Sequence, residues 1–144
     1  MNVPEPALKT SILSAGYGRI QVLRDISLQV KAQEIVGILG HNGMGKSTLL
    51  KTLMGFLPAT SGLVEYNGHD ITRTPTHVRN RLGIGYVPQG RGIFPKLTVR
   101  DNLRFAYHAD RDVSEGQALD RTLETFPRIR PLLDREGGNL SGGE

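Results

Sequence analysis

The sequence contains no cysteine, which excludes disulfides and thiolate metal sites among its 144 residues. It also has no apolar run near the ~18 residues of a membrane-spanning helix. The first thirty residues carry Glu5, Lys9, Arg19, Arg24 and Asp25 between short apolar runs, so we expect no signal-peptide core there. If the protein works at a membrane, we therefore expect it to be bound to a partner that spans the membrane.

Neither sign of charge dominates the chain. The 18 Lys and Arg residues exceed the 14 Asp and Glu residues by four, giving a net charge of +4. A small basic excess fits a phosphate-bearing ligand or a nucleic acid. The basic residues are spread along the chain and form no basic tail, which favours a solvated surface, and we predict no nucleic-acid partner. A hydrophobic share of 38% is that of a globular domain with a core.

Hydrophobic periodicity predicts strands in the front half and helices in the back half. Alternating strands are predicted at 8–14 and 22–30 around a Gly16-Tyr17-Gly18 turn, and at 63–66 before an Asn67-Gly68 turn and a hairpin to Ile71. The apolar runs 34–39 (EIVGIL) and 83–87 (GIGYV) predict buried strands. Helices are predicted at 46–54 with Leu49, Leu50 and Leu53 on the apolar face, at 76–81 after Pro75, and at 97–107 and 115–126, with breaks at Pro127 and Pro131. This order indicates an α/β core with a helical extension from about Leu97.

Residues 40–47 (GHNGMGKS) match the phosphate-loop pattern G-x-x-x-x-G-K-[ST] in full, between a predicted buried strand and a predicted helix. The glycines let successive N–H groups curl around an anion, and the helix start adds its positive dipole end. Lys46 can reach the β- and γ-phosphates, and Ser47 can offer a hydroxyl ligand to Mg²⁺. The alternative, a glycine-rich turn that caps an ordinary helix, needs only one or two glycines. His41 stands at a variable position and is interpreted as a spacer.

The run Leu140-Ser141-Gly142-Gly143-Glu144 is the second informative motif. Two glycines after a serine, at an expected helix start, predict another anion-binding N-terminus. Taken alone these residues are a commonplace loop. They gain weight because a phosphate loop lies upstream in the same chain.

With both motifs, nearly the whole chain resembles the ABC-type ATPases. Residues 40–47 look like their Walker A motif and LSGGE like their signature motif, while Gln89 and Tyr17 stand where the family has its Q-loop glutamine and adenine-stacking aromatic. The run 82–99 (LGIGYVPQGRGIFPKLTV) is similar to the ATP-binding subunits of importers for branched-chain amino acids, urea and amides, and Asp70-Ile71-Thr72 and Asn102-Leu103 agree with that. The resemblance implies a P-loop NTPase fold with an antiparallel β subdomain and a helical subdomain. Residues 1–96 would form the ATP-binding core with the β subdomain, and 97–144 the helical subdomain up to the signature motif.

The resemblance also implies the site residues. ATP would be held by Tyr17, Gly40, His41, Asn42, Gly43, Met44, Gly45, Lys46, Ser47 and Thr48, and by Ser141, Gly142 and Gly143 acting on the ATP of a second protomer. Lys46 and Gln89 would serve catalysis, and Ser47 and Gln89 would contact Mg²⁺. The alternatives are that Tyr17 is a surface turn residue and Gln89 a solvated loop residue.

The implied partners are membrane-spanning permease subunits and a second ATP-binding subunit packed head to tail. The implied location is peripheral, at the cytoplasmic face of the inner membrane. The segment 90–99, with Ile93, Phe94 and Leu97, would lie beside the membrane subunit; a core-facing loop is an equal alternative.

In the family, the metal-holding acid and the switch histidine both follow the signature motif. The acid lies on an apolar strand that ends in Asp-Glu, and the histidine lies further along the chain. Residues 1–144 contain no such strand, and His41, His69, His77 and His108 all precede the signature. We therefore expect a partial sequence, incomplete at its C-terminus, that folds poorly alone and turns over ATP very slowly. Alternatives are a non-catalytic nucleotide-binding module, an ABC-type ATPase acting on DNA or ribosomes, which the run 82–99 disfavours, and a GTPase, disfavoured by the lack of an N-K-x-D motif.

Overall fold

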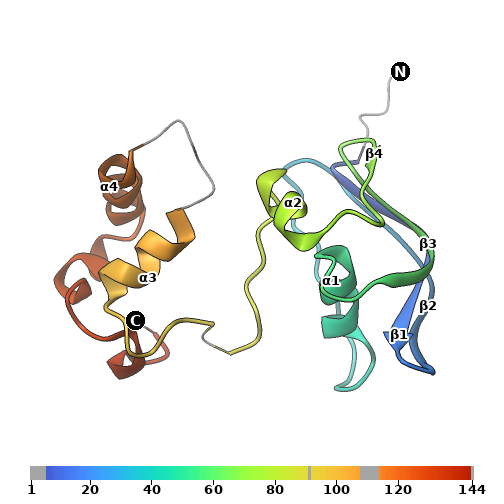
Figure 1. Cartoon of the computed structure of the whole chain (residues 1–144), viewed down its shortest axis with the longest axis horizontal. Coiled ribbons are helices and arrows are strands. Elements are labelled where there is room, and N and C mark those ends of the chain that lie inside the picture. The colour runs from blue at the N-terminus through green and yellow to red at the C-terminus, as the bar shows by residue number, and fades with distance from the viewer. Residues whose placement is uncertain (1–5, 91, 108–113, 144) are drawn as a thin grey trace. The chain divides into compact units, whose positions relative to one another are not determined.

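The chain is divided into two compact units, Met1–Ile84 and Gly85–Glu144 (Figure 1). The structure, a computed structural model, describes residues 6–90, 92–107 and 114–143. The sheet and the helices α1 and α2 belong to the first unit, and α3 and α4 belong to the second.

The first unit is built on a four-stranded antiparallel sheet with the strand order β2-β1-β3-β4. Its strands are β1 (Leu8–Tyr17), β2 (Ile20–Val30), β3 (Ala59–Tyr66) and β4 (His69–Asp70). The predicted hairpins are confirmed. The first turn lies at Gly18-Arg19, slightly later than predicted, because Tyr17 is still in β1 and pairs with Ile20.

Helix α1 (Lys46–Leu53) follows the glycine-rich loop and packs on this sheet. Leu49 and Leu53 are buried, as predicted, whereas Leu50 is 41% exposed, which corrects the predicted apolar face. The buried cluster around the helix consists of Leu13, Ala15, Leu23, Leu49, Leu53, Val64 and Ile71. The short helix α2 (Thr76–Arg81) has the predicted bounds, with Pro75 as its N-cap.

The predicted buried strands at 34–39 and 83–87 are wrong for this structure. Ile35 is 98% exposed, Leu39 94% and Val87 86%. A strand satisfies its backbone N–H and C=O groups by pairing with a neighbour. No strand among the described residues pairs with either segment, so both apolar runs remain outside the sheet.

The second unit is helical, with α3 (Val99–Ala106), α4 (Glu115–Thr125) and two short 3-10 helices, η2 (Pro127–Leu132) and η3 (Gly137–Asn139). Val99, Leu123 and Leu133 form its buried cluster. Helix α3 begins later than predicted because Thr98 acts as N-cap and accepts a hydrogen bond from the Asp101 N–H. Ser114 and Gln117 form a capping box at the start of α4.

Pro127 ends the α-helical pattern as predicted, but the chain continues as the 3-10 helix η2, which also contains Pro131. After η2 the chain returns to the start of α3. The N–H of Val99 donates to the Arg135 carbonyl (2.9 Å), and the N–H of Arg100 donates to the Leu133 carbonyl (2.9 Å). The segment that approaches Ser141 is thereby joined to α3.

Candidate nucleotide-binding site

The loop before α1 has a backbone shape that depends on glycine. Gly43 has φ 87° and Gly45 has φ 89°, in the left-handed region that L residues with a side chain rarely adopt. Gly45 is the N-cap of α1 and supplies no capping side chain. The loop therefore turns directly into the helix and leaves the helix start open to a ligand.

Gly45 also lies close to strand β2. A Cβ atom built at this position would be 3.1 Å from Leu23 Cδ2 and 3.1 Å from Val22 Cγ1. Both distances are tighter than ordinary van der Waals contact, so a side chain here would push Leu23 and Val22 aside in addition to straining the positive φ. The sheet fixes the loop by this contact.

The Lys46 side chain folds back over its own loop. Its Nζ donates to the carbonyl oxygens of Gly40 (2.6 Å) and His41 (2.8 Å). This arrangement holds one positive charge over the loop that starts the helix.

The first turn of α1 presents backbone donors beside this charge. The first hydrogen bond of the helix runs from Leu49 N to Gly45 O (2.8 Å), so the preceding N–H groups have no acceptor within the helix. Ser47 in this turn is exposed, while Thr48 is buried against the core. An ammonium, open N–H groups and the dipole end together suit a polyphosphate.

The opposite end of α1 is held by a buried arginine that we did not single out from the sequence. Arg79 of α2 is 2% exposed, and its Nη1 donates to the carbonyl oxygens of Thr52 (3.0 Å) and Leu53 (2.6 Å) in the last turn of α1. Its Nε donates to Thr74 O (2.8 Å) and its Nη2 to Thr72 O (2.9 Å). The guanidinium thus satisfies four carbonyls and opposes the negative end of the helix dipole.

Burial lowers the pKa of Arg79, and the charge of Asp70 partly opposes this shift. Arginine nevertheless stays protonated in proteins. Asp70 itself accepts hydrogen bonds from the Thr72 hydroxyl (2.6 Å) and the Thr72 N–H (2.8 Å). These bonds to the charged form lower the pKa of the Asp70 carboxyl.

Tyr17 lies at the end of β1 and is 47% exposed. It belongs to the hairpin whose second strand, β2, supports Gly45 through Val22 and Leu23. The structure therefore places Tyr17 and the loop 40–48 in the same unit, on the β1–β2 hairpin and the segment that follows it.

Gln89 and Ser141–Gly143 belong to the second unit. Gln89 is an exposed residue in a bend that follows the segment 84–88, which forms neither helix nor strand. Ser141, Gly142 and Gly143 are exposed, just after Leu140, which packs against the buried cluster of that unit. Glu144, the last residue of the signature motif, and Arg91 in the segment 90–99 lie outside the described residues.

Within the described ranges no group of three or more His, Cys, Asp or Glu residues could hold a metal ion. The oxygen donors expected for Mg²⁺ are instead the single hydroxyl of Ser47 and the amide of Gln89. The same ranges contain no helix that is long and apolar enough to cross a membrane.

Comparison with known proteins agrees with the loop geometry. Residues 23–144 match the family model described as ABC transporter. The chain is 42% identical over 138 residues to a probable branched-chain amino acid transport ATP-binding protein, LivF, from Archaeoglobus fulgidus, covering 95% of this chain and 58% of that protein. It is 41% identical over 134 residues to the lipopolysaccharide export system ATP-binding protein LptB of Escherichia coli, covering 92% of this chain and 56% of that protein.

Solved structures give the same result. The fold is similar to a nucleotide-free ATP-binding cassette from an ABC transporter, with a TM-score of 0.79 at 27% sequence identity, covering 96% of this chain and 60% of that one. The α/β fold class of an ABC ATPase is thereby confirmed. The chain spans less than two thirds of each of these relatives.

Proposed function

Because the chain belongs to the ABC transporter family, we propose that residues 40–48 bind the triphosphate of ATP and that the whole protein couples ATP binding and hydrolysis to transport. The observation that carries the proposal is the glycine-shaped loop that opens into α1 with the Lys46 ammonium held over it. Phosphate oxygens would replace the carbonyls of Gly40 and His41 as acceptors for Lys46. The N–H groups of the first turn would complete the phosphate cradle.

Mg²⁺ would accompany the nucleotide, and the residues present fit it in part. The exposed Ser47 hydroxyl is an oxygen donor on the first turn of α1, the type of ligand that Mg²⁺ prefers. Gln89 offers an amide oxygen that carries no charge, suited to contacting the ion or the attacking water. Bound Mg²⁺ would neutralise charge on the β- and γ-phosphates.

Tyr17 would stack on the adenine ring. Its side chain is 47% exposed on the hairpin that supports the loop, so a flat ligand face could cover it. Stacking tolerates different bases, because each base has a π face.

Ser141, Gly142 and Gly143 would bind the γ-phosphate of ATP held by a second protomer. All three are exposed, as a contact between subunits requires. Two chains would then pack head to tail with two nucleotides in one interface, and ATP binding and loss would close and open the pair.

Membrane-spanning permease subunits would be the other partners, and the protein would lie at the cytoplasmic face of the inner membrane. Phe94 is 49% exposed and Ile93 37%, whereas Leu97 is half-buried. The front of the segment 90–99 thus offers apolar contact area while its end packs inward. This supports part of the segment as the docking surface for the permease.

Import of branched-chain amino acids, or of urea and amides, is the proposed transport reaction, supported by the identity to the LivF protein. Export is a second candidate, supported by the nearly equal identity to LptB. Vesicles containing the protein and its membrane subunits would separate the two. ATP-driven accumulation of a branched-chain amino acid supports import, and ATP-driven release of lipopolysaccharide supports export.

ATP binding is tested by Lys46→Ala beside Lys51→Ala, which removes the same charge from an exposed position on the same helix. Loss of the charge-assisted contacts to phosphate should weaken ATP binding by about 10- to 100-fold in Lys46→Ala. Lys51→Ala should bind ATP like the unchanged protein. Equal affinities in the two variants would remove the phosphate-loop assignment. Phosphate release by the full chain then distinguishes an ATPase from a non-catalytic nucleotide-binding module.

A further inference from the structure

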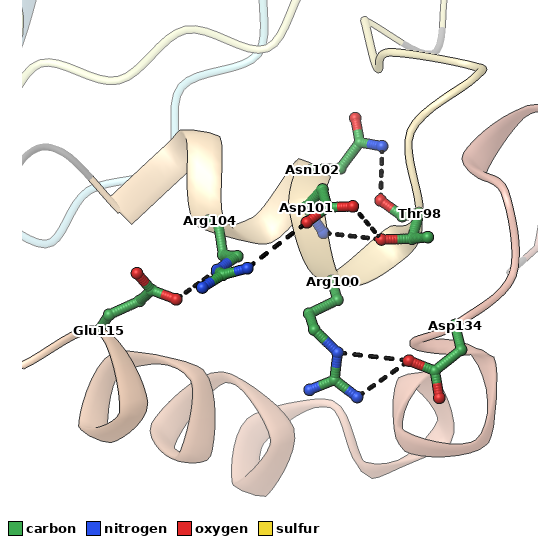
Figure 2. Close-up of polar contacts among 7 residues, drawn as sticks. All are labelled: Thr98, Arg100, Asp101, Asn102, Arg104, Glu115 and Asp134. Atoms are coloured by element: carbon green, nitrogen blue, oxygen red, sulfur yellow. Dashed lines mark hydrogen bonds and ion pairs between the residues drawn. The ribbon is translucent and has the colours of Figure 1, made fainter.

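The side chain of Asn102 on α3 organises the segment in front of that helix. Its Nδ2 donates to the carbonyl oxygens of Phe94 (3.0 Å), Leu97 (3.3 Å) and Thr98 (2.9 Å). Its Oδ1 accepts from the Phe94 N–H (2.8 Å). Figure 2 shows the carboxamide of Asn102 reaching Thr98 at the start of the helix. One amide therefore holds the segment 94–98 at both of its ends.

The other side of the same segment is held by the chain that leads to Ser141. The N–H of Gly137 donates to Leu97 O (2.8 Å), and the N–H of Gly138 donates to Pro95 O (2.9 Å). The carbonyl of Leu97 thus accepts from both Asn102 and Gly137. Three segments meet at this point: Asn102 of α3, residues 94–98, and Gly137-Gly138. We call this set of contacts the joint.

Gly137 and Gly138 leave little room for a side chain. A Cβ at the buried Gly137 would be 3.2 Å from Asn102 Nδ2 and 3.2 Å from Ile93 Cδ1. A Cβ at Gly138 would be 2.9 Å from the Pro95 carbonyl oxygen. The two glycines therefore pack their backbone directly on the amide and on the segment that it holds.

Two exposed features lie at the ends of this joint. On one side the rings of Phe94 and Phe105 have centroids 4.7 Å apart, and Phe94 is 49% and Phe105 64% exposed. On the other side two residues, Asn139 and Leu140, separate Gly138 from the segment Ser141–Gly143. The aromatic pair and the signature residues are thus connected through a few backbone hydrogen bonds and one side chain.

We propose that Asn102 is a positioning residue that joins the exposed pair Phe94 and Phe105 to the segment carrying Ser141–Gly143, so that pressure on the aromatic pair changes the position of the signature residues. The joint itself stands on the contacts above. Its use in transport rests on the proposed function, in which a partner covers the aromatic pair and the signature residues bind nucleotide.

Hydrogen exchange in the full chain tests the joint without any partner. Asn102→Asp keeps the shape and one acceptor oxygen but loses the donors to three carbonyls. Exchange should become about tenfold faster in peptides covering both 93–97 and 137–143, because the carbonyls of Phe94, Leu97 and Thr98 lose their donor. Arg100→Ala is the control. It lies on the same helix, and its exposed pair with Asp134 (3.0 Å) is drawn in Figure 2. It should leave both peptides unchanged.

The outcomes separate the alternatives. Faster exchange in 93–97 with 137–143 unchanged would overturn the joint, because Asn102 would then be only a local cap. If Asn102→Asp does not fold, Gly138→Ala can be used instead. Its Cβ would lie 2.9 Å from the Pro95 carbonyl oxygen and so perturb the same contacts from the segment 137–138. It should accelerate exchange at 93–97 by a similar factor, and no change there overturns the proposal equally.

Transmission is measured in the complex with the membrane subunits. Asn102→Asp should reduce the stimulation of ATP hydrolysis by those subunits by about tenfold, while the affinity for ATP at the Lys46 loop stays unchanged, and Arg100→Ala should keep full stimulation. Coupled exchange with normal stimulation overturns the transmitting role. If the unchanged protein shows no stimulation, the proposed function fails instead, and the exchange result alone decides the joint.

Discussion

Arg79 donates from Nη1 to the carbonyl oxygen of Leu53 across 2.6 Å, and this contact joins a buried guanidinium to the last turn of the helix that begins at Lys46. Three further carbonyls, those of Thr52, Thr72 and Thr74, accept from the same side chain. Helix α1 is thus held at its start, through Gly45, by strand β2 and at its end by Arg79. The contacts of Arg79 therefore stabilise the first unit and also hold the helix whose start carries the glycine-rich loop.

Replacing Arg79 by Met should destabilise the protein by about 2–4 kcal/mol, because four carbonyls lose their donor while the side chain keeps much of its volume. Arg79→Lys should lie between Met and the unchanged protein, since a compact ammonium cannot match the planar fork. Arg81→Met, on the same helix but exposed, should change stability by less than about 0.5 kcal/mol. Denaturant unfolding followed by circular dichroism measures all three. Equal effects at 79 and 81 would contradict the support role.

Gly55 should resist substitution for two separable reasons. It ends α1 with φ 76°, its N–H donating to Thr52 O (3.0 Å) while the N–H of Phe56 donates to Lys51 O (2.9 Å), the pattern of a Schellman cap. A Cβ here would also lie 3.0 Å from Arg79 Nε. Gly55→Ala should therefore cost about 1–3 kcal/mol, more than Gly18→Ala, where φ is 56° but nothing lies within 4 Å.

A double-mutant cycle assigns the steric part of this cost. In an Arg79→Met background the guanidinium that the new Cβ would meet is absent. Gly55→Ala should therefore cost less in that background than in the unchanged protein. The measured quantity is the free energy of unfolding of the single and double variants. Strict additivity would show that contact with Arg79 contributes nothing, leaving the backbone angle at Gly55 and the 3.2 Å approach to the Thr74 carbonyl oxygen as the causes.

The sequence was informative where local chemistry decides the structure. The pattern around Lys46 predicted the loop and helix α1, and the Asn67-Gly68 pair predicted a tight hairpin turn, which forms with φ 48° and 76°. Thr98 shows the limit of such reasoning. The helix was predicted to begin at 97, but the Thr98 hydroxyl accepts a hydrogen bond from the Asp101 N–H (3.1 Å), so α3 begins at Val99.

Features that depend on distant segments could not be predicted in this way. The apolar runs 34–39 and 83–87 have the composition of buried strands, but a strand forms only beside a partner, and no described strand pairs with them. Arg79 and Arg81 look alike in the sequence. One is buried because the carbonyls of Thr52 and Leu53, distant in the chain, surround it.

The stability of the first unit should depend on pH through Asp70. Because hydrogen bonds from Thr72 lower the pKa of this carboxyl in the folded state, the folded protein favours the charged form more than the unfolded chain does. Its stabilising contribution is complete above the unfolded pKa of about 3.9 and is lost as the pH falls through the lower folded pKa. Asp70→Asn keeps an acceptor oxygen for Thr72 but cannot titrate.

The measurement is the free energy of unfolding of both proteins between neutral pH and about pH 2. The unchanged protein should be the more stable at neutral pH, and the difference should shrink toward zero on acidification. A difference that stays constant over this range would show that the carboxylate charge at Asp70 adds nothing to the contacts with Thr72.

Removal of the N-cap hydroxyl at Thr98 should destabilise the second unit. This hydroxyl accepts from the Asp101 N–H and donates to the Asp101 carboxylate (2.6 Å), as Figure 2 shows, so one side chain satisfies an open N–H of α3 and fixes an acidic residue in its first turn. Thr98→Ala should cost about 1 kcal/mol, and Thr98→Ser should recover most of it. Thr125→Ala is the matched control, because that exposed hydroxyl only donates to a carbonyl within α4. Denaturant unfolding followed by helix ellipticity measures the three variants, and equal losses in both alanine variants would show that the hydroxyl at 98 does not act as a cap.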